Sequence, residues 1–107
     1  MRTDVLIHKN KNLVEGLQRL NKLRNLSRLI LFVIDDNHKV VGSVTDGDIR
    51  RSIIAEQNLQ KTLGEIANPD FKRLYQTDSY QSFEKYRKLD IKILPILNSE
   101  GILVDLI

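Results

Sequence analysis

Residues 29–54, LILFVIDDNHKVVGSVTDGDIRRSII, hold two short apolar runs and the start of a helix. The runs Leu29–Ile34 and Val40–Val44 are rich in β-branched residues and predict buried strands. Residues 35–39, DDNHK, form a turn, because Asp and Asn side chains hydrogen-bond their own backbone. We therefore predict a β-hairpin. Gly42 interrupts its second strand, which predicts that backbone or ligand comes close there.

The hairpin leads into a predicted helix over residues 46–55, where polar groups converge. We expect Asp46 to cap this helix, and Ile49, Ile53 and Ile54 to form its buried side. An ionised Asp48 accepts hydrogen bonds only, which suits the paired hydroxyls of a ribose. The Thr45 hydroxyl and the first helix amides can donate to a phosphate, whose charge the helix dipole favours. Further phosphates could be clamped by Arg50 and Arg51.

Other interpretations of these polar residues remain open. Acidic residues at a helix start serve as caps in any protein. Asp46 and Asp48 could also be taken as a metal pair, although the other ligands of a calcium loop are missing from the sequence. His8 and His38 stand alone in extended and turn segments, so surface positions are the default and a metal or general-base role is the alternative.

Working outward, the segment before the hairpin predicts a strand and a helix. Val5–Ile7 is a short strand candidate, and Asn12 with Glu15 has the spacing of a capping box. An apolar stripe then predicts a helix that ends near Asn25; its members are Leu13, Leu17, Leu20 and Leu23. Beyond the hairpin and its helix, residues 56–61 are polar and predict a joint. Leu63 and Ile66 predict a helical turn, which Asn68-Pro69 ends.

The same order of signals then starts again, which predicts an internal duplication. Leu74 is a brief extended segment, and Asp78 with Gln81 repeats the cap. A helical stripe follows at an offset of 66, and a strand, turn and strand follow at an offset of 63; these segments are Tyr80–Leu89, Ile91–Leu97, 98–101 and Ile102–Ile107. We assign residues 1–60 to the first copy and 61–107 to the second. Counterparts of Thr45, Asp48 and the closing helix are absent, so we expect a truncated second copy within a longer protein.

This β-α-β-β-α order, repeated in tandem, resembles a pair of CBS (cystathionine-β-synthase-type) domains of the α/β (α+β) class. The chain looks most like the pair that precedes the catalytic domain of bacterial sugar-phosphate nucleotidyltransferases. The family's site pattern falls on Gly42, Val44, Thr45 and Asp48, within the stretch 42–49, GSVTDGDI, that includes Ser43. The second copy departs from it, with Asp105 in place of the glycine, so one complete nucleotide site is implied.

The resemblance also implies a ligand, partners and a role. The ligand would be an adenine nucleotide, with its base in an apolar cleft near Val5, Ile7 and the start of the 29–34 strand. Such pairs are expected to form homodimers and to regulate an attached catalytic domain, here one after Ile107. The alternative is an association module that binds no nucleotide. No nucleophile–base pair, metal cluster or Walker A loop occurs in the sequence, so we expect a regulatory fragment and no enzyme.

Composition limits the remaining possibilities. The chain has no cysteine, which excludes disulfides and thiolate metal sites, and it has no run of about 18 apolar residues. We expect a cytoplasmic protein without membrane contact. Residues 1–28 carry seven Lys/Arg and two Asp/Glu, a net charge of +5. This excess raises nucleic-acid binding as a hypothesis, but no aromatic residue precedes Phe32, and basic helix faces are usually just solvated. Tyr80, Phe83 and Tyr86 indicate a core or an interface rather than a base-stacking platform.

Overall fold

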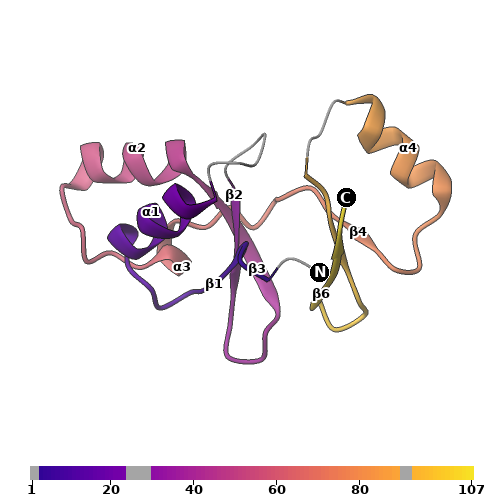
Figure 1. Ribbon diagram of the computed structural model, residues 1–107, viewed down its shortest axis with the longest axis horizontal. Coiled ribbons are helices and arrows are strands. Elements are labelled where there is room, and N and C mark those ends of the chain that lie inside the picture. The colour runs from indigo at the N-terminus through magenta and orange to yellow at the C-terminus, as the bar shows by residue number, and fades with distance from the viewer. Residues whose placement is uncertain (1–2, 24–29, 90–92) are drawn as a thin grey trace.

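The computed structural model describes residues 3–23, 30–89 and 93–107, which form a mixed α+β fold with two small sheets (Figure 1). This confirms the predicted fold class. None of the helices in those residue ranges is long and apolar enough to cross a membrane. The elements in chain order are β1 (Leu6–His8), α1 (Leu13–Lys22), β2 (Ile30–Ile34), β3 (Val40–Thr45), α2 (Asp46–Glu56), α3 (Leu63–Ile66), β4 (Leu74–Tyr75), α4 (Tyr80–Lys88), β5 (Pro95–Leu97) and β6 (Leu103–Leu106).

The two sheets repeat one topology. In the first sheet β1 runs parallel to β2 and β2 runs antiparallel to β3; in the second, β4, β5 and β6 have the same relations. Each antiparallel ladder has a register shift, between Val33 and Ile34 in the first and between Ile96 and Leu97 in the second. These positions differ by 63 residues, the offset of the hairpins in the sequence. The shared irregularity supports the predicted duplication, because a bulge marks one particular position in a ladder.

The hairpin turns are also the same structure. Asp35 Oδ1 accepts hydrogen bonds from the backbone N–H groups two and four residues later, at 2.9 and 3.0 Å. Asn98 Oδ1 accepts the equivalent pair at 2.9 and 3.0 Å. The fourth residue of each turn has a positive φ, 63° at His38 and 82° at Gly101. A side-chain oxygen therefore holds each turn closed, whether it comes from a carboxylate or an amide.

The two copies meet through these turns. Lys39 and Ile102 form an antiparallel bridge, and the Val40 N–H donates to the Gly101 carbonyl at 2.9 Å. Lys39 and Ile102 differ by 63 residues, so each is the other's counterpart in the repeat. A contact between equivalent residues places a pseudo-twofold axis between the copies.

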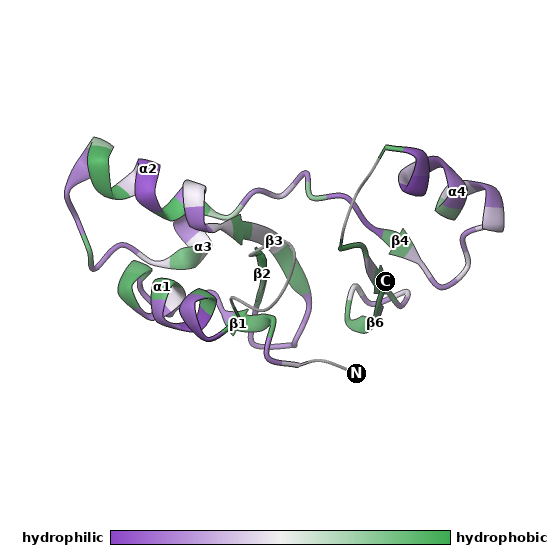
Figure 2. Ribbon diagram, turned by 45° about the horizontal axis from the view of Figure 1, so that its top comes forward, coloured by the Kyte–Doolittle hydropathy of each residue, from purple (hydrophilic) through white to green (hydrophobic). Residues whose placement is uncertain are grey.

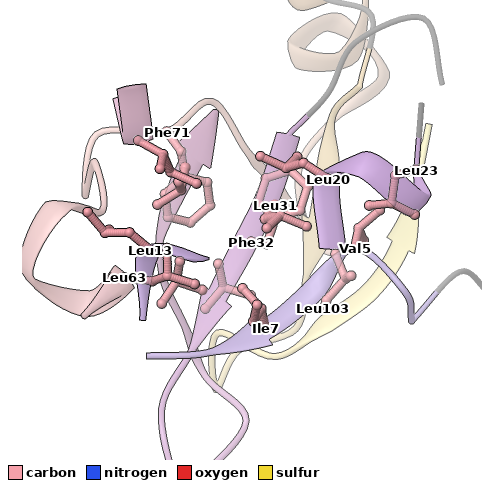
Figure 3. Packing of buried hydrophobic residues seen from close by; sticks show 14 of the residues in the cluster. Val5, Ile7, Leu13, Leu20, Leu23, Leu31, Phe32, Leu63, Phe71 and Leu103 are labelled. Atoms are coloured by element: carbon pink, nitrogen blue, oxygen red, sulfur yellow. The ribbon is translucent and has the colours of Figure 1, made fainter. Parts of the chain in front are cut away.

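One hydrophobic core joins the two sheets. Its buried side chains form a single cluster to which the second half of the chain contributes Phe71, Leu97 and Leu103 (Figure 3). The Phe71 and Phe32 rings lie 6.1 Å apart, a separation typical of interacting aromatic pairs. Apolar residues concentrate on the strands, while hydrophilic ones line much of α4 and the segment before β4 (Figure 2). Neither sheet has a core of its own, which predicts that the two unfold together.

The first helix follows the sequence prediction at its start. Asn12 Oδ1 accepts from the Glu15 N–H at 2.9 Å and the Glu15 carboxylate accepts from the Asn12 N–H, which confirms the capping box. The helix ends at Lys22, and Leu23 is its C-cap, so the predicted end near Asn25 is too late. Residues 24–29, which include the predicted strand start at Leu29, lie outside the described part.

The predicted cap of the fourth helix is wrong. Ser79 caps α4 by accepting from the Ser82 N–H, while Asp78 accepts from the Tyr75 N–H at 2.7 Å and so closes the preceding turn. Aligning the caps gives an offset of 67 between Asn12 and Ser79, whereas the C-caps Leu23 and Leu89 differ by 66. The second helix is therefore one residue shorter than the first.

Two predicted buried stripes are partly exposed. In α2, Ile49 is buried and Ile53 packs against the core, but Ile54 is 76% exposed. Ile54 follows Ile49 by five residues, which turns it away from the face that positions four apart share. In α4, Tyr80 and Leu89 are exposed and none of residues 80–88 is fully buried.

The predicted strands differ from the observed ones at their ends. β1 begins at Leu6 rather than Val5, and β6 covers Leu103–Leu106 within the predicted Ile102–Ile107. β5 begins at Pro95; of the earlier predicted strand residues, 91 and 92 lie outside the described part. The hairpin strands β2 and β3 match the prediction closely.

The shared core predicts that damage in the second sheet destabilises the whole chain. Leu103 is buried in the common cluster, so Leu103→Ala should lower the free energy of unfolding by about 2–5 kcal/mol. Urea unfolding followed by circular dichroism and by tyrosine fluorescence should give one coincident transition. Leu59→Ala, at an exposed position, is the control and should stay within about 0.5 kcal/mol. Two separate transitions would contradict a shared core.

The turn at Asp35 predicts a measurable pH dependence. Burial alone would raise the pKa of Asp35, but hydrogen bonds from the Lys39 and Asn37 amides and the nearby charges of Lys9 and Lys39 hold it below its usual value. A lowered pKa adds stability above the unfolded pKa of about 3.9 and loses it as pH falls. Asp35→Asn should therefore unfold at less urea than the native chain at pH 7, and the difference should vanish below the folded pKa.

The control for this titration is Asp35→Ala. Asn98 shows that an amide oxygen can hold this turn, so Asp35→Asn should be the more stable of the two variants across the pH range. Equal urea midpoints for the two variants would contradict a role for the side-chain oxygen in closing the turn.

Candidate functional site

The candidate site is built where β3 passes into α2. Thr45 has an extended backbone, with φ −108° and ψ 166°, and is the N-cap of the helix. Its Oγ1 accepts from the Asp48 N–H at 3.2 Å, and Asp48 Oδ2 accepts from the Thr45 N–H at 2.9 Å. The predicted cap, Asp46, is therefore wrong: it is the first helical residue, and the residue before it has the extended backbone that capping requires.

Each carboxylate at this helix start has an arginine partner on the same helix. Arg50 Nε donates to Asp46 Oδ2 and Arg51 Nη2 donates to Asp48 Oδ1, both at 2.6 Å. The hydrogen bond and charge of Asp46 raise the pKa of Arg50. Both guanidinium groups are mostly exposed, whereas the Asp48 side chain is 30% exposed. The pairing fixes the orientation of Asp48 and leaves further guanidinium N–H groups facing solvent.

Gly47 takes part in this arrangement, although the sequence prediction did not include it. A Cβ at Gly47 would lie 3.1 Å from Arg51 Nη1, so the guanidinium lies against the first turn of the helix. The sequence signal was a glycine between two aspartates at a helix start, where a small residue lets a ligand or side chain approach the backbone. Any anion bound to the first-turn amides would therefore meet Arg51 as well.

Gly42, Ser43 and Val44 form the framework beneath this site. A Cβ at Gly42 would lie 2.7 Å from the Ala67 Cβ and 3.0 Å from the Asn68 carbonyl oxygen. Ser43 exchanges two backbone hydrogen bonds with Asn68, of 3.0 and 2.9 Å, and Val44 is fully buried. The close approach predicted at Gly42 is therefore made by backbone after α3. The sequence analysis missed Ala67 and Asn68 as its source, because they lie 25 residues further along the chain.

Val5 and Ile7, the predicted contacts for the base, lie in the shared core. Val5 is 0% and Ile7 5% exposed, and both belong to the cluster that also contains Leu103. Thr45, Asp46, Asp48, Arg50 and Arg51 are thus brought together at one helix start, whereas Val5 and Ile7 are covered by the second copy.

The residues considered for metal binding have other partners. Among the described residues, no three His, Asp or Glu side chains lie together as a metal site would require. His8 Nε2 lies 2.7 Å from Asp36 Oδ1, and His8 Nδ1 accepts from the Asn10 N–H. His38 occupies the left-handed position of the first turn.

The basic face of α1 borders a polar groove of about 170 Å³, lined by Ile7, Lys11, Glu15, Gln18, Arg19 and Lys22. Arg19 donates to the carbonyl oxygens of Asp4 and Leu6, at 3.1 and 2.6 Å. Lys11 pairs with Glu15 at 3.5 Å. Two of these three cations thus serve contacts within the chain, and nucleic-acid binding by this face stays a hypothesis.

Comparison with known sequences identifies the first copy. Residues 1–55 match the family model of the CBS domain. A 54-residue segment, half of the chain, is 43% identical to an uncharacterised protein, MJ1232, of Methanocaldococcus jannaschii. The chain spans only 17% of that curated relative, so the relative contains much that this chain does not.

Solved structures share the fold over 95% of the chain. Staphylococcus aureus OpuCA superposes with a TM-score of 0.77 at 20% identity, covering 82% of that chain. Listeria monocytogenes CbpB, solved in complex with c-di-AMP, gives 0.76 at 16% identity and 77% coverage. CBSX2 in complex with AMP gives 0.71 at 19% identity and 78% coverage. The repeated β-α-β-β order, the Thr45–Asp48 helix start and the match over residues 1–55 lead to one conclusion: the chain belongs to the CBS domain family.

Proposed function

We propose that this chain is a regulatory module that binds an adenine nucleotide at the start of α2. The observation that carries the proposal is the Thr45–Asp48 capping box, which holds a carboxylate and a hydroxyl beside the first amides of a helix. Similar folds solved with AMP and with c-di-AMP support this ligand class. The module is not itself an enzyme, and the nucleotide acts as a signal rather than a cofactor.

The site can meet both polar parts of such a ligand. Asp48 already accepts from Thr45 and Arg51, but two carboxylate oxygens offer about four acceptor positions, so two ribose hydroxyls can still bind. The phosphate would lie over the first turn of α2, where orphan amides and the helix dipole favour an anion. Arg51, already lying against Gly47, would turn from Asp48 toward the phosphate, and Arg50 would do the same for further phosphates.

The proposed signal is a change in the relation between the two copies, which we place at 1–60 and 61–107. Val5 and Ile7 are covered by the shared core, so a base that reaches them must displace side chains at the junction of the sheets. A ligand that binds the displaced arrangement more tightly shifts the population toward it. With Asp105 replacing the glycine in the second copy, the module has one site.

The wider setting of the module belongs to the proposal. A regulatory pair needs a catalytic domain to act upon, and the resemblance noted for the sequence favours a sugar-phosphate nucleotidyltransferase attached after Ile107. The module would work in the cytoplasm as a homodimer, in contact with neither membrane nor nucleic acid.

A second candidate function is an association module that binds no nucleotide. It is favoured by the exposed apolar side chains Tyr75, Tyr80, Leu89 and Ile107 around α4, since a large exposed apolar surface usually marks an interaction site. In that case the polar residues at the start of α2 would only cap the helix and pair with one another.

Ligand-dependent stabilisation separates the two functions. Thermal unfolding would be measured with AMP, ADP, ATP, c-di-AMP and nucleotide sugars. A ligand at about 100 times its dissociation constant should add roughly 2.7 kcal/mol, several degrees for a domain of this size. The shift should disappear in Asp48→Ala, which removes the carboxylate proposed to hold the ribose.

The matched control is Glu15→Ala, which breaks the capping box of α1 in the same way. Each variant should cost about 0.5–2 kcal/mol without ligand, but only Asp48→Ala should lose the ligand response. A shift that persists in Asp48→Ala would remove Asp48 from the site. The absence of any shift in the folded native chain would leave the association module as the function.

A further inference from the structure

Helix α4 lacks the cover that α1 has. In the first copy, Leu13 and Leu20 of α1 are buried, and Gly16 lies against Ile49 of α2 and Leu63 of α3. Helix α4 repeats α1, but among its residues 80–88 none is fully buried. Its flanking C-cap Leu89 is 59% exposed and Tyr80 is 71% exposed. An amphipathic helix in this state carries an apolar surface that water covers only at a cost.

The exposed surface is grooved and rich in aromatic residues. A groove of about 340 Å³ runs between α4 and the second sheet, with Tyr75, Tyr80, Phe83, Ile96 and Ile107 in its lining. The Tyr80 hydroxyl is hydrogen-bonded to Glu84, which raises the pKa of Tyr80 and anchors its ring at the rim. Tyrosine is enriched at protein interfaces, because it offers a large rigid surface with a polar tip.

The most exposed large apolar side chain among the described residues is Ile54, on α2. It lies in the last turn of that helix, which contains Glu56 and no basic residue. The last turn of α4 contains Lys85, Arg87 and Lys88. The carbonyl end of a helix is negative, so the end of α2 and the surface of α4 are complementary in charge as well as apolar.

The two surfaces are placed so that two copies can exchange them. The molecule measures 43 × 29 × 22 Å, and α2 and α4 lie near opposite ends of its longest axis (Figure 1). Both views place them on the same side of the sheets (Figures 1 and 2). We propose that a second copy of this chain, turned end to end about a twofold axis, docks its α2 end, with Ile54 and Glu56, against the exposed surface of α4.

This arrangement uses each surface once in each copy and leaves neither open. In a twofold interface a contact between one surface and another is made twice, so both Ile54 and Tyr80 are covered in both copies. A standard interface takes about 800 Å² from each partner, roughly an eighth of the 6790 Å² surface of this chain. The inference gives the proposed homodimer its surface, and it does not require that a nucleotide binds.

Sedimentation velocity over a range of concentrations tests the pairing. The native chain should dimerise, and Ile54→Ser and Tyr80→Ser should each weaken the dimer at least tenfold. Tyr80→Phe keeps the ring and should retain it, as should Leu59→Ser, which alters an exposed apolar residue outside both surfaces. Circular dichroism would check that each variant is folded, which the exposure of all three positions favours.

Charge reversal tests which surfaces meet. Glu56→Lys and Lys88→Glu should each weaken the dimer, and the double variant should regain affinity, because the reversed charges face one another across the interface. A monomeric native chain at about 100 µM would overturn the proposal. So would a dimer that Tyr80→Ser weakens but Ile54→Ser does not, since α4 would then pair with some other surface. A nucleotide response without dimerisation, or the reverse, separates this inference from the proposed function.

Discussion

The structure depends on one constraint: neither three-stranded sheet can bury its apolar face alone. The strands are two to six residues long, and a sheet of that size needs a second layer to exclude water. The chain meets this need by placing two copies of one motif face to face. Leu97 and Leu103 of the second sheet complete the cluster around Phe32 of the first. The bridge between Lys39 and Ile102 fixes how the copies are turned, and so where every helix lies.

The candidate site combines structural and chemical roles in the same atoms. Thr45 and Asp48 satisfy the start of α2, and that requirement places a carboxylate and a hydroxyl beside helix amides. The contact between Gly42 and the Ala67–Asn68 backbone holds β3 in place beneath them. Ligand binding at such a position exchanges contacts within the helix for contacts with the ligand. A regulatory site built this way can therefore respond to a ligand without a large rearrangement of its own loop.

The two copies are equivalent in their hairpins and differ in their helices. The turns and bulges match position by position, because each is determined by hydrogen bonds within the hairpin. Helix α1 is covered by α2 and α3, whereas α4 shows Tyr80 and Leu89 to solvent. The loss of symmetry leaves one half of the molecule suited to ligand binding and the other to association. These two properties come from different parts of the same repeat.

Local chemistry alone was enough to predict much of this structure. The hairpin over residues 29–44, the Asn12 capping box and the duplication could be read from the chain, because turns, caps and apolar periods depend on neighbours a few residues apart. The choice of Thr45 over Asp46 and of Ser79 over Asp78 as caps depended on backbone geometry, which residue types do not specify. The burial of Val5 and Ile7, the exposure of Ile54 and Tyr80, and the close approach at Gly42 were decided by tertiary structure. Each depends on residues distant in the sequence, and only the packing of the two sheets brings such residues together or keeps them apart.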